Sequence, residues 1–286
     1  MFEFNTTKIQ MNKFWLIIIC LHISLLAAAQ KKMFPLHSKL IESSALVKYK
    51  SNFITVNDSG NKPKVYVFDK KGDIVNTCFI KGANNIDWEA LAYDGHTYLY
   101  IGDIGNNENK RKDLTIYKVK LSEVIEKDTV HSESILYSYP DQAMFPPYKS
   151  ALYYDAEALI VKDEKLYIFT KNRTVPFDGI SKVYSLPTVP GEYQAKIQED
   201  LNLLATTWRE ESITDAAYFM DELYILTYSK IYMFKMENGS WVQQKEYLHD
   251  SWTQKEGIAV DKKYIYITDE NPTSIFSNNY LYRLKK

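Results

Sequence analysis

The sequence of 286 residues has only two cysteines and ten glycines, and it has no long apolar run beyond its N-terminal part. Cys20 lies within that apolar part, so removal of the segment would leave Cys78 alone and exclude a disulfide within the domain. We expect Cys78 to be a small buried residue rather than a reactive thiol. The fold must therefore be held by its own core, for which 23 tyrosines, 13 phenylalanines and 5 tryptophans are available.

The chain also lacks a cluster of basic residues. Its formal net charge is −1, and the densest basic run, Lys110-Arg111-Lys112, is typical of a solvated loop. Proteins that bind nucleic acids carry a basic patch or stripe on one face. The composition therefore argues against nucleic acid as a partner.

The first 29 residues have the organisation of a secretory signal peptide. Lys8 and Lys13 supply positive charge, residues 14–26 are apolar, and Ala27-Ala28-Ala29 offers a small-residue cleavage site. The apolar run is shorter than the roughly 20 residues that a membrane-spanning helix needs. We predict a signal peptide at 1–29 and one exported domain at 30–286, periplasmic or extracellular, with no transmembrane helix after cleavage. The alternative is an uncleaved membrane anchor, and Met11 is an alternative start.

Short runs of β-branched and aromatic residues recur through the rest of the chain. Examples are 53–56, 98–101, 166–169 and 264–267, each bounded by Asp, Asn, Gly or Lys turns. Helical periodicity is missing except for one short stretch at 121–126. The chain is therefore predicted to be all-β.

Five segments share one layout. A polar residue opens a strand of small and apolar residues, and a second polar residue closes the next strand 13 or 14 positions later. Chance does not produce five such pairs in succession. The pairs are Ser44 and Asp58, Glu89 and Asp103, Glu157 and Lys171, Asp215 and Tyr228, and Glu256 and Asp269.

This repeat predicts the fold class. A period of roughly 40 to 50 residues with about four strands is typical of propeller blades. We predict a single β-propeller of five blades, as a monomer. The alternatives are a sixth blade hidden between 103 and 155, or a pair of β-sandwiches. The last repeat ends after three strands, so we expect the N-terminal segment 32–40 to supply the missing outer strand and close the ring.

The polar residues of the repeats are expected to meet. In an antiparallel hairpin the start of the first strand lies beside the end of the second, and the first strand of each blade is innermost. All five pairs would then face one mouth of the channel, with seven carboxylates among them. Two carboxylates about 5 Å apart repel by roughly 3 kcal/mol at an effective dielectric near 20. Either some pKa values rise or a cation binds; the structural alternative is that each carboxylate caps backbone amides at a turn.

The residue types in this ring indicate which cation it would hold. Oxygen ligands without histidine or cysteine favour Ca²⁺ or Mg²⁺ over zinc. We therefore predict bound Ca²⁺ held by Glu89, Asp103, Glu157, Glu256 and Asp269. Glycines beside Asp and Asn in the segment 102–107 would let the backbone approach a ligand closely. The residues predicted to bind that ligand are Asp58, Lys171, Asp215, Tyr228 and Asn106.

Several of these motifs resemble bacterial propellers of the SdiA-regulated and esterase-like phytase type. The similarity lies in 42–46 with 56–60, 87–92 with 100–107, 139–141, 155–159 and 256–259, and so covers nearly all of the chain after the signal segment. The resemblance implies a calcium-binding, usually exported propeller and makes a hydrolase conceivable. The chain departs from phytase-like pockets because its sequence shows no clustered Lys and Arg for phosphate.

Two functions fit these observations. The first is a binding propeller whose metal-occupied mouth recognises a small molecule or a surface polymer. The second is a metal-dependent hydrolase of an ester, lactone or phosphoester, in which the cation would polarise the substrate or activate water. A serine nucleophile elbow is missing, and the five histidines lie away from the repeat positions, which disfavours a catalytic triad. The sequence leaves open which of the two applies and what the ligand is.

Overall fold

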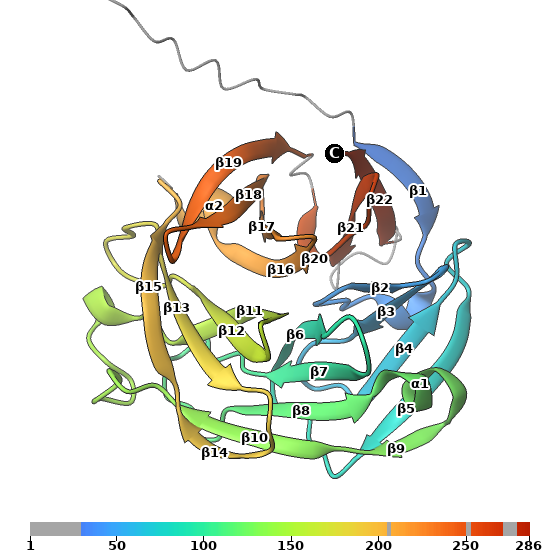
Figure 1. Cartoon of the computed structure of the whole chain (residues 1–286), viewed down its shortest axis with the longest axis horizontal. Helices are drawn as coiled ribbons and strands as arrows, with labels where there is room; N and C mark the ends of the chain where they lie inside the picture. Colours follow the sequence, from blue (N-terminus) through green and yellow to red (C-terminus); the bar gives the residue numbers. More distant parts are fainter. Residues whose placement is uncertain (1–29, 205–206, 250–252, 271–278) are drawn as a thin grey trace, which may run out of the picture.

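The computed structural model describes residues 30–204, 207–249, 253–270 and 279–286, so the predicted signal segment lies outside the described residues. Its strands form five sheets arranged around a central channel, as Figure 1 shows looking down that channel. The prediction of an all-β propeller with five blades is confirmed. Among the helices of the described chain, none is long and apolar enough to cross a membrane.

Each blade is a mostly antiparallel sheet whose first strand lines the channel. Blade I contains β2 (Val47–Tyr49), β3 (Asn52–Val56), β4 (Lys64–Phe68), β5 (Ile74–Lys81) and β9 (Thr129–His131). Blade II contains β6 (Trp88–Tyr93), β7 (Tyr98–Asp103), β8 (Thr115–Lys120), β10 (Glu133–Ser138) and β14 (Gly191–Gln194). Blade III contains β11 (Asp155–Lys162), β12 (Lys165–Lys171), β13 (Ile180–Pro187) and β15 (Lys196–Asn202).

The remaining two blades follow the same order. Blade IV contains β16 (Ile213–Phe219), β17 (Glu222–Thr227), β18 (Lys230–Glu237) and β19 (Ser240–Leu248). Blade V contains β20 (Gln254–Val260), β21 (Tyr264–Glu270), β22 (Tyr280–Lys285) and β1 (Lys31–Pro35). Two short α-helices, α1 (Leu121–Glu126) and α2 (Trp208–Glu211), and two 3₁₀ turns at 38–40 and 149–151 complete the described elements.

The ring closes as the sequence predicts. Strand β1, from the N-terminal end of the domain, pairs antiparallel with β22 at its C-terminal end, and Figure 1 shows the C-terminus beside β1. The alternative of a sixth blade between 103 and 155 is wrong, because β10 from that region is an outer strand of blade II. The β-sandwich alternative is wrong for the same reason of topology: the five sheets are separate blades of one ring.

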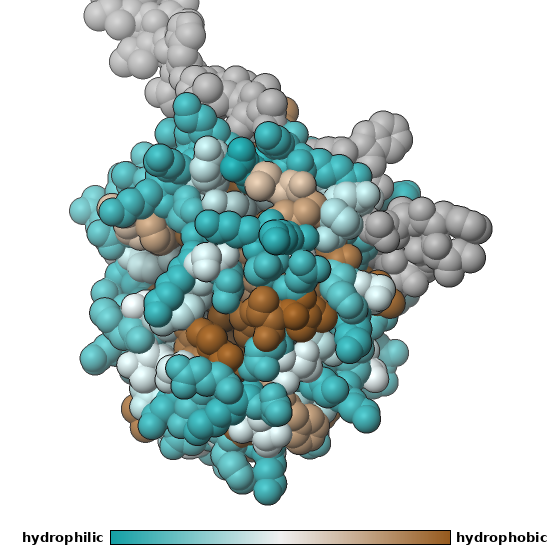
Figure 2. Space-filling model, turned by 90° about the vertical axis from the view of Figure 1, so that its right-hand side faces the viewer, coloured by the Kyte–Doolittle hydropathy of each residue, from teal (hydrophilic) through white to brown (hydrophobic). Residues whose placement is uncertain are grey.

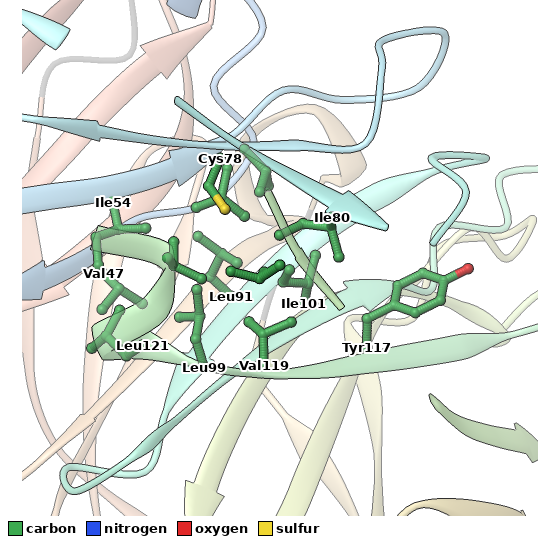
Figure 3. Packing of buried hydrophobic residues seen from close by; sticks show 14 of the residues in the cluster. Val47, Ile54, Cys78, Ile80, Leu91, Leu99, Ile101, Tyr117, Val119 and Leu121 are labelled. Atoms are coloured by element: carbon green, nitrogen blue, oxygen red, sulfur yellow. The ribbon is translucent and has the colours of Figure 1, made fainter. Parts of the chain in front are cut away.

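The core lies in layers between neighbouring blades rather than in one central mass. Figure 3 shows such a layer between blades I and II, where Ile54, Leu91 and Ile101 pack around Cys78. Cys78 is fully buried and is a free thiol, as expected. Because both faces of a strand within a blade contact a neighbouring blade, strands such as β3 are buried over four successive residues instead of every second one. Each fully buried aliphatic side chain contributes roughly 1.5–3 kcal/mol.

Two strands cross from one blade to the next. The segment between β8 and β10 supplies β9, which pairs in parallel with β5 of blade I. The segment between β13 and β15 supplies β14, which pairs in parallel with β10 of blade II. These exchanges tie blades I, II and III together and cover two outer sheet edges. The outer surface is largely hydrophilic, although one side has a recess lined with hydrophobic residues (Figure 2).

Candidate metal and ligand site at one mouth of the channel

A β-bulge near the start of the inner strand recurs in four blades. In blade II, Trp88 pairs with Asp103 and Ala90 with Gly102, which leaves Glu89 as the extra residue. The same register shift leaves one extra residue in blades III, IV and V. Bulges re-aim the side chain they insert, and here they turn carboxylates toward the channel. The extra residues in these three blades are Glu157, Thr214 and Glu256.

The end of the second strand supplies the side chains opposite these carboxylates. In blade III this residue is Lys171, which pairs with Asp155, and in blade V it is Glu270, which pairs with Gln254. The predicted residues Asp103 and Asp269 lie one position earlier, and Asp215 lies one position after the bulge residue Thr214. A shift of one residue along a strand turns its side chain to the opposite face.

The bulge carboxylates and these opposing residues enclose a cavity of about 130 Å³ at one mouth of the channel. Six residues of the predicted site line it together: Asp58, Glu89, Glu157, Lys171, Tyr228 and Glu256. Six further residues complete the wall: Ser44, Asn107, Arg173, Trp208, Gln254 and Glu270. Of these, only Ser44 is one of the repeat positions.

Three carboxylates on one side of this mouth are close enough to bind one cation. Asp58, Asp87 and Glu89 each have a carboxylate oxygen that lies within 4.8 Å of the other two. Glu89 is buried, with 7% of its surface exposed. Gly105 makes room for the cluster, because a Cβ there would lie 2.4 Å from Oδ2 of Asp87 and 2.8 Å from Cγ of Glu89.

The protonation behaviour of this cluster fits a cation site. Burial raises the pKa of Asp87 to about 7, and the neighbouring Asp58 carboxylate adds to the shift. Burial, followed by the charges of Glu157 and Asp58, raises the pKa of Glu89 well above its usual range. Carboxylates held this close are relieved by protons or by a cation. Three carboxylates offer up to six hard oxygens, which fits Ca²⁺ with its six to eight oxygen ligands at roughly 2.3–2.6 Å.

Two cationic side chains stand among the acidic ones on blade III. Lys171 Nζ lies 3.2 Å from Oε1 of Glu157 and donates a hydrogen bond of 3.0 Å to the Tyr228 hydroxyl. Burial lowers the pKa of Lys171, but Glu157 and the other acidic neighbours outweigh burial and raise it well above its usual range. Lys171 is therefore a fixed positive charge within the mouth.

Arg173 is the second of these cations. Its guanidinium forms an ion pair with Asp155, lies 3.6 Å from Oε1 of Glu157, and donates to the side-chain oxygen of Asn107. The Trp208 ring lies 5.6 Å from the guanidinium carbon, a cation–π contact at the rim. Basic residues do gather here, although they are not adjacent in the sequence.

Blade V contributes two carboxyl groups that both accept a hydrogen bond from one side-chain amide. Gln254 Nε2 donates to Oε1 of Glu256 and, at 2.9 Å, to Oε2 of Glu270. The Tyr228 hydroxyl also lies 3.3 Å from Oε1 of Glu256, whereas Oε2 of Glu256 is buried and has no hydrogen-bond partner in the described chain. Burial, followed by the charge of Glu256, raises the pKa of Glu270 to about 8, and burial also raises the pKa of Glu256.

Four residues of the predicted site lie behind the cavity wall, each with its own partners. Asp103 lies 3.1 Å from Nη1 of Arg111 and accepts the backbone amide of Asp87. Asp269 accepts hydrogen bonds from the hydroxyls of Thr253 and Tyr282. Asp269 also accepts the backbone amide of Tyr280, so both residues accept a backbone amide, as the capping alternative expects, whereas Oδ2 of Asp103 is buried with no hydrogen-bond partner in the described chain.

The other two are also held by the backbone. Asp215 is fully buried and accepts three backbone amides. Asn106 accepts the amides of Lys110 and Arg111 and donates to the carbonyl of Tyr154. Its neighbour Asn107 lines the cavity instead. Trp88 packs between blades I and II.

Some residues that line the mouth could have been predicted from their spacing in the sequence, although they are not repeat positions. Asp87 lies two positions before Glu89, and Arg173 lies two positions after Lys171. Glu270 follows Glu256 by 14 positions, the spacing that separates Glu157 from Lys171. Trp208 and Gln254 stand outside the repeated layout, and only the folded ring brings them to the mouth.

Comparison with known proteins supports the fold and gives no family for this chain. No family model and no curated protein matches the sequence. Among solved structures, glutaminyl cyclase from Myxococcus xanthus is similar with a TM-score of 0.52 and 13% identity, covering 90% of this chain and 97% of that one. The PQQ-bound form of an aldose sugar dehydrogenase from Streptomyces coelicolor has a TM-score of 0.50 and 8% identity, covering 90% and 98%. Both likenesses support the propeller fold.

Proposed function

We propose that this chain is an exported propeller, periplasmic or extracellular, whose acidic mouth binds Ca²⁺ and, beside it, a small molecule or part of a surface polymer. The observation that carries the proposal is the cluster of Asp58, Asp87 and Glu89, whose carboxylate oxygens lie within 4.8 Å of one another. Its ligands are all oxygen, and no histidine or cysteine lines the mouth among the described residues. Such a donor set favours Ca²⁺ or Mg²⁺ over zinc.

The rest of the mouth supports a ligand beside the cation. The cation, Lys171 and Arg173 would attract acceptor oxygens, whereas the unpaired Oε2 of Glu256 needs a donor. A ligand that carries both hydroxyl or amino groups and acceptor oxygens satisfies both sides. A buried acceptor without a donor costs roughly 1–3 kcal/mol, more when charged, so this oxygen favours a bound partner. The family resemblance in the sequence points to calcium in the same way.

Calorimetric titration of residues 30–286 with CaCl₂ tests the cation site. We expect one site per chain, tighter for Ca²⁺ than for Zn²⁺, and at least tenfold weaker binding in Glu89→Gln. Glu192→Gln is the matched control, because Glu192 is exposed on β14, far along the outer edge of blade II. Binding of Ca²⁺ that is equally tight in Glu89→Gln and in the control would contradict the assignment.

A second candidate function is metal-dependent hydrolysis of an ester, lactone or phosphoester. The observation in its favour is Glu270, whose pKa of about 8 keeps a proton available near neutral pH next to the cation cluster. Lys171 and Arg173 would stabilise developing negative charge. Turnover of ester, lactone and phosphate substrates should then require Ca²⁺, stop with chelator and fall at least a hundredfold in Glu270→Gln. A calcium-induced stability gain without turnover favours the binding role alone.

A further inference from the structure

A second and larger cavity of about 350 Å³ lies in the channel away from the acidic mouth. The mouth lies at the end of the blades where the inner strands begin, whereas this cavity is lined by later residues of those strands. All five blades contribute, through Leu46, Leu91, Leu159, Ala216 and Ala259 and the residues that follow each of them. We call this cavity the basin. The basin and the acidic mouth share no lining residue.

Asp215 lies where the two cavities are separated. From blade IV its carboxylate accepts the backbone amide of Leu46 in blade I and that of Ile258 in blade V. These bonds draw inner strands from three blades together between the mouth and the basin. The basin is therefore a site of its own, and the proposal made for it does not depend on the cation site.

Among the residues that the structure describes, the basin lining carries no uncompensated charge. Its two ionic lining residues, Lys48 and Asp261, lie 3.3 Å apart as an ion pair. Asp261 also accepts the backbone amides of Lys263 and Tyr264. A charged ligand would find no free counter-charge here and would lose its hydration, which is costly. A neutral ligand fits the basin.

The wall combines apolar side chains with open backbone. The partly exposed side chains of Val161, Ala217, Tyr93, Tyr218 and Phe219 line it. The side chains of Leu46, Leu91 and Leu159 are almost fully buried in the cores between blades. Each inner strand, β2, β6, β11, β16 or β20, is the last strand of its sheet, so its channel-facing edge has no strand partner in the described chain. Backbone N–H and C=O groups on such an edge require hydrogen bonds from elsewhere. The volume is within the roughly 300–1,000 Å³ typical of small-molecule sites.

We propose that the basin binds a neutral small molecule with an apolar, ring-containing body and hydrogen-bonding groups at its edge. The apolar body packs on the partly exposed aliphatic and aromatic side chains, and the edge groups bond to the inner strands. Water alone satisfies the backbone edges but gains nothing from the apolar wall. A molecule of this class satisfies both.

Fluorescence titration with N-phenyl-1-naphthylamine, a neutral aromatic amine with one N–H donor, tests the proposal on residues 30–286. We expect saturable enhancement with one site per chain. Ala217→Trp fills the basin from its wall and should weaken binding at least tenfold. The control Val189→Trp places the same side chain at an exposed turn residue, 58% exposed, and should leave the affinity unchanged.

Thermal unfolding of each variant shows whether it folds, and Ala217→Leu provides a smaller step if tryptophan prevents folding. Weaker binding in the basin variants, with unchanged binding in the control, supports the proposal whether or not the protein binds Ca²⁺. No saturable enhancement in the unmodified chain would overturn it. Enhancement that is equal in Ala217→Trp or Ala217→Leu and in the control would overturn it as well.

Discussion

The carboxylate of Asp215 in blade IV accepts a hydrogen bond of 3.3 Å from the backbone amide of Leu46 in blade I, across the channel. Its Oδ2 also accepts the amide of Ile258 in blade V at 2.8 Å, and its Oδ1 accepts the amide of Ala216 at 2.8 Å. The ring closes within blade V, where β1 pairs with β22. Asp215 therefore connects the inner side of blade V, the blade that closes the ring, to blades IV and I, whereas β1 completes blade V at its outer edge.

Replacement of Asp215 should destabilise the fold strongly. Asp215→Ala leaves three buried amide groups without their acceptor, and each unsatisfied group costs roughly 1–3 kcal/mol. We expect a loss of about 3 kcal/mol or more in the free energy of unfolding, measured by urea denaturation. The control Asp73→Ala removes an exposed aspartate and should change stability by less than about 0.5 kcal/mol. Equal stability of the two variants would contradict the structural role of Asp215.

Gly105 tests the cation cluster without removing any of its ligands. In Gly105→Ala the new Cβ would lie 2.4 Å from Oδ2 of Asp87, so the aspartate and Glu89 must move. We expect Ca²⁺ affinity to fall at least tenfold in a calorimetric titration. Gly239→Ala is the control: its φ of +89° strains the backbone at a hairpin in blade IV, away from the cluster. Affinity that falls equally in both variants would show a general loss of fold rather than a local displacement.

The fold could be predicted from the sequence more completely than the site. Five similar hairpins in succession reveal five blades even when their register is misjudged, because blade count depends only on the repeat. The residues that form the site, in contrast, depend on the exact pairing register of the first two strands in each blade, and an error of one residue changes them. Aligning acid with acid matched Asp215 to Glu89 and Glu256, whereas the bulge places Thr214 at that position. A bulge has no distinctive residue type in this chain, so its position became visible only in the paired strands.

Side chains from outside the repeat could not be placed from the sequence at all. Trp208 begins a short helix between blades III and IV, and its approach to Arg173 depends on how two loops pack. The backbone roles of Asn106 and Asp103 were also hidden, since a carboxylate or amide that caps amides looks like a ligand in sequence. Capping was the alternative weighed for each acidic residue; Asp103 does accept a backbone amide, and the side chain of Asn106 accepts two.

Calcium binding should strengthen as the pH rises from 6 to 8. The pKa of Asp87 is about 7 and that of Glu270 about 8, and the pKa of Glu89 is also raised, so protons compete with the cation in this range. For each group that must lose a proton to bind the cation, the affinity should rise by at most about tenfold for each pH unit of increase below the pKa of that group. Titrations in buffers of different ionisation enthalpy should detect the released protons. Affinity that is constant from pH 6 to 8 with no proton release would contradict the prediction.

Without calcium, the same groups should make stability fall with rising pH. Their folded-state pKa values lie above the usual values near 4, so between pH 4 and 8 the folded chain holds more protons than the unfolded chain. The free energy of unfolding then decreases as the pH rises through this window. Urea denaturation in the presence of chelator, at pH 5 and pH 8, measures the difference. Added Ca²⁺ should raise stability more at pH 8 than at pH 5.

Strand β1 should be needed for a stable ring. It pairs with β22 at four positions and places Lys32 Nζ 3.3 Å from the centre of the Tyr280 ring. Deletion of residues 30–35 removes these bonds and exposes β22 as a sheet edge. At about 1 kcal/mol for each hydrogen bond lost, we expect a loss of roughly 2–4 kcal/mol in urea denaturation. The point variant Lys32→Ala should cost less than about 1 kcal/mol, and an undiminished stability of the deletion would argue against closure by β1.

The central claim is that a cation binds between Asp58, Asp87 and Glu89. A crystal structure of residues 30–286 grown with calcium, with anomalous data to locate the ion, tests it most directly. The account predicts an ion with an oxygen of each of the three carboxylates at roughly 2.3–2.6 Å. An ion elsewhere in the mouth, or no ion with the three side chains unmoved at a calcium concentration of several millimolar, would contradict it.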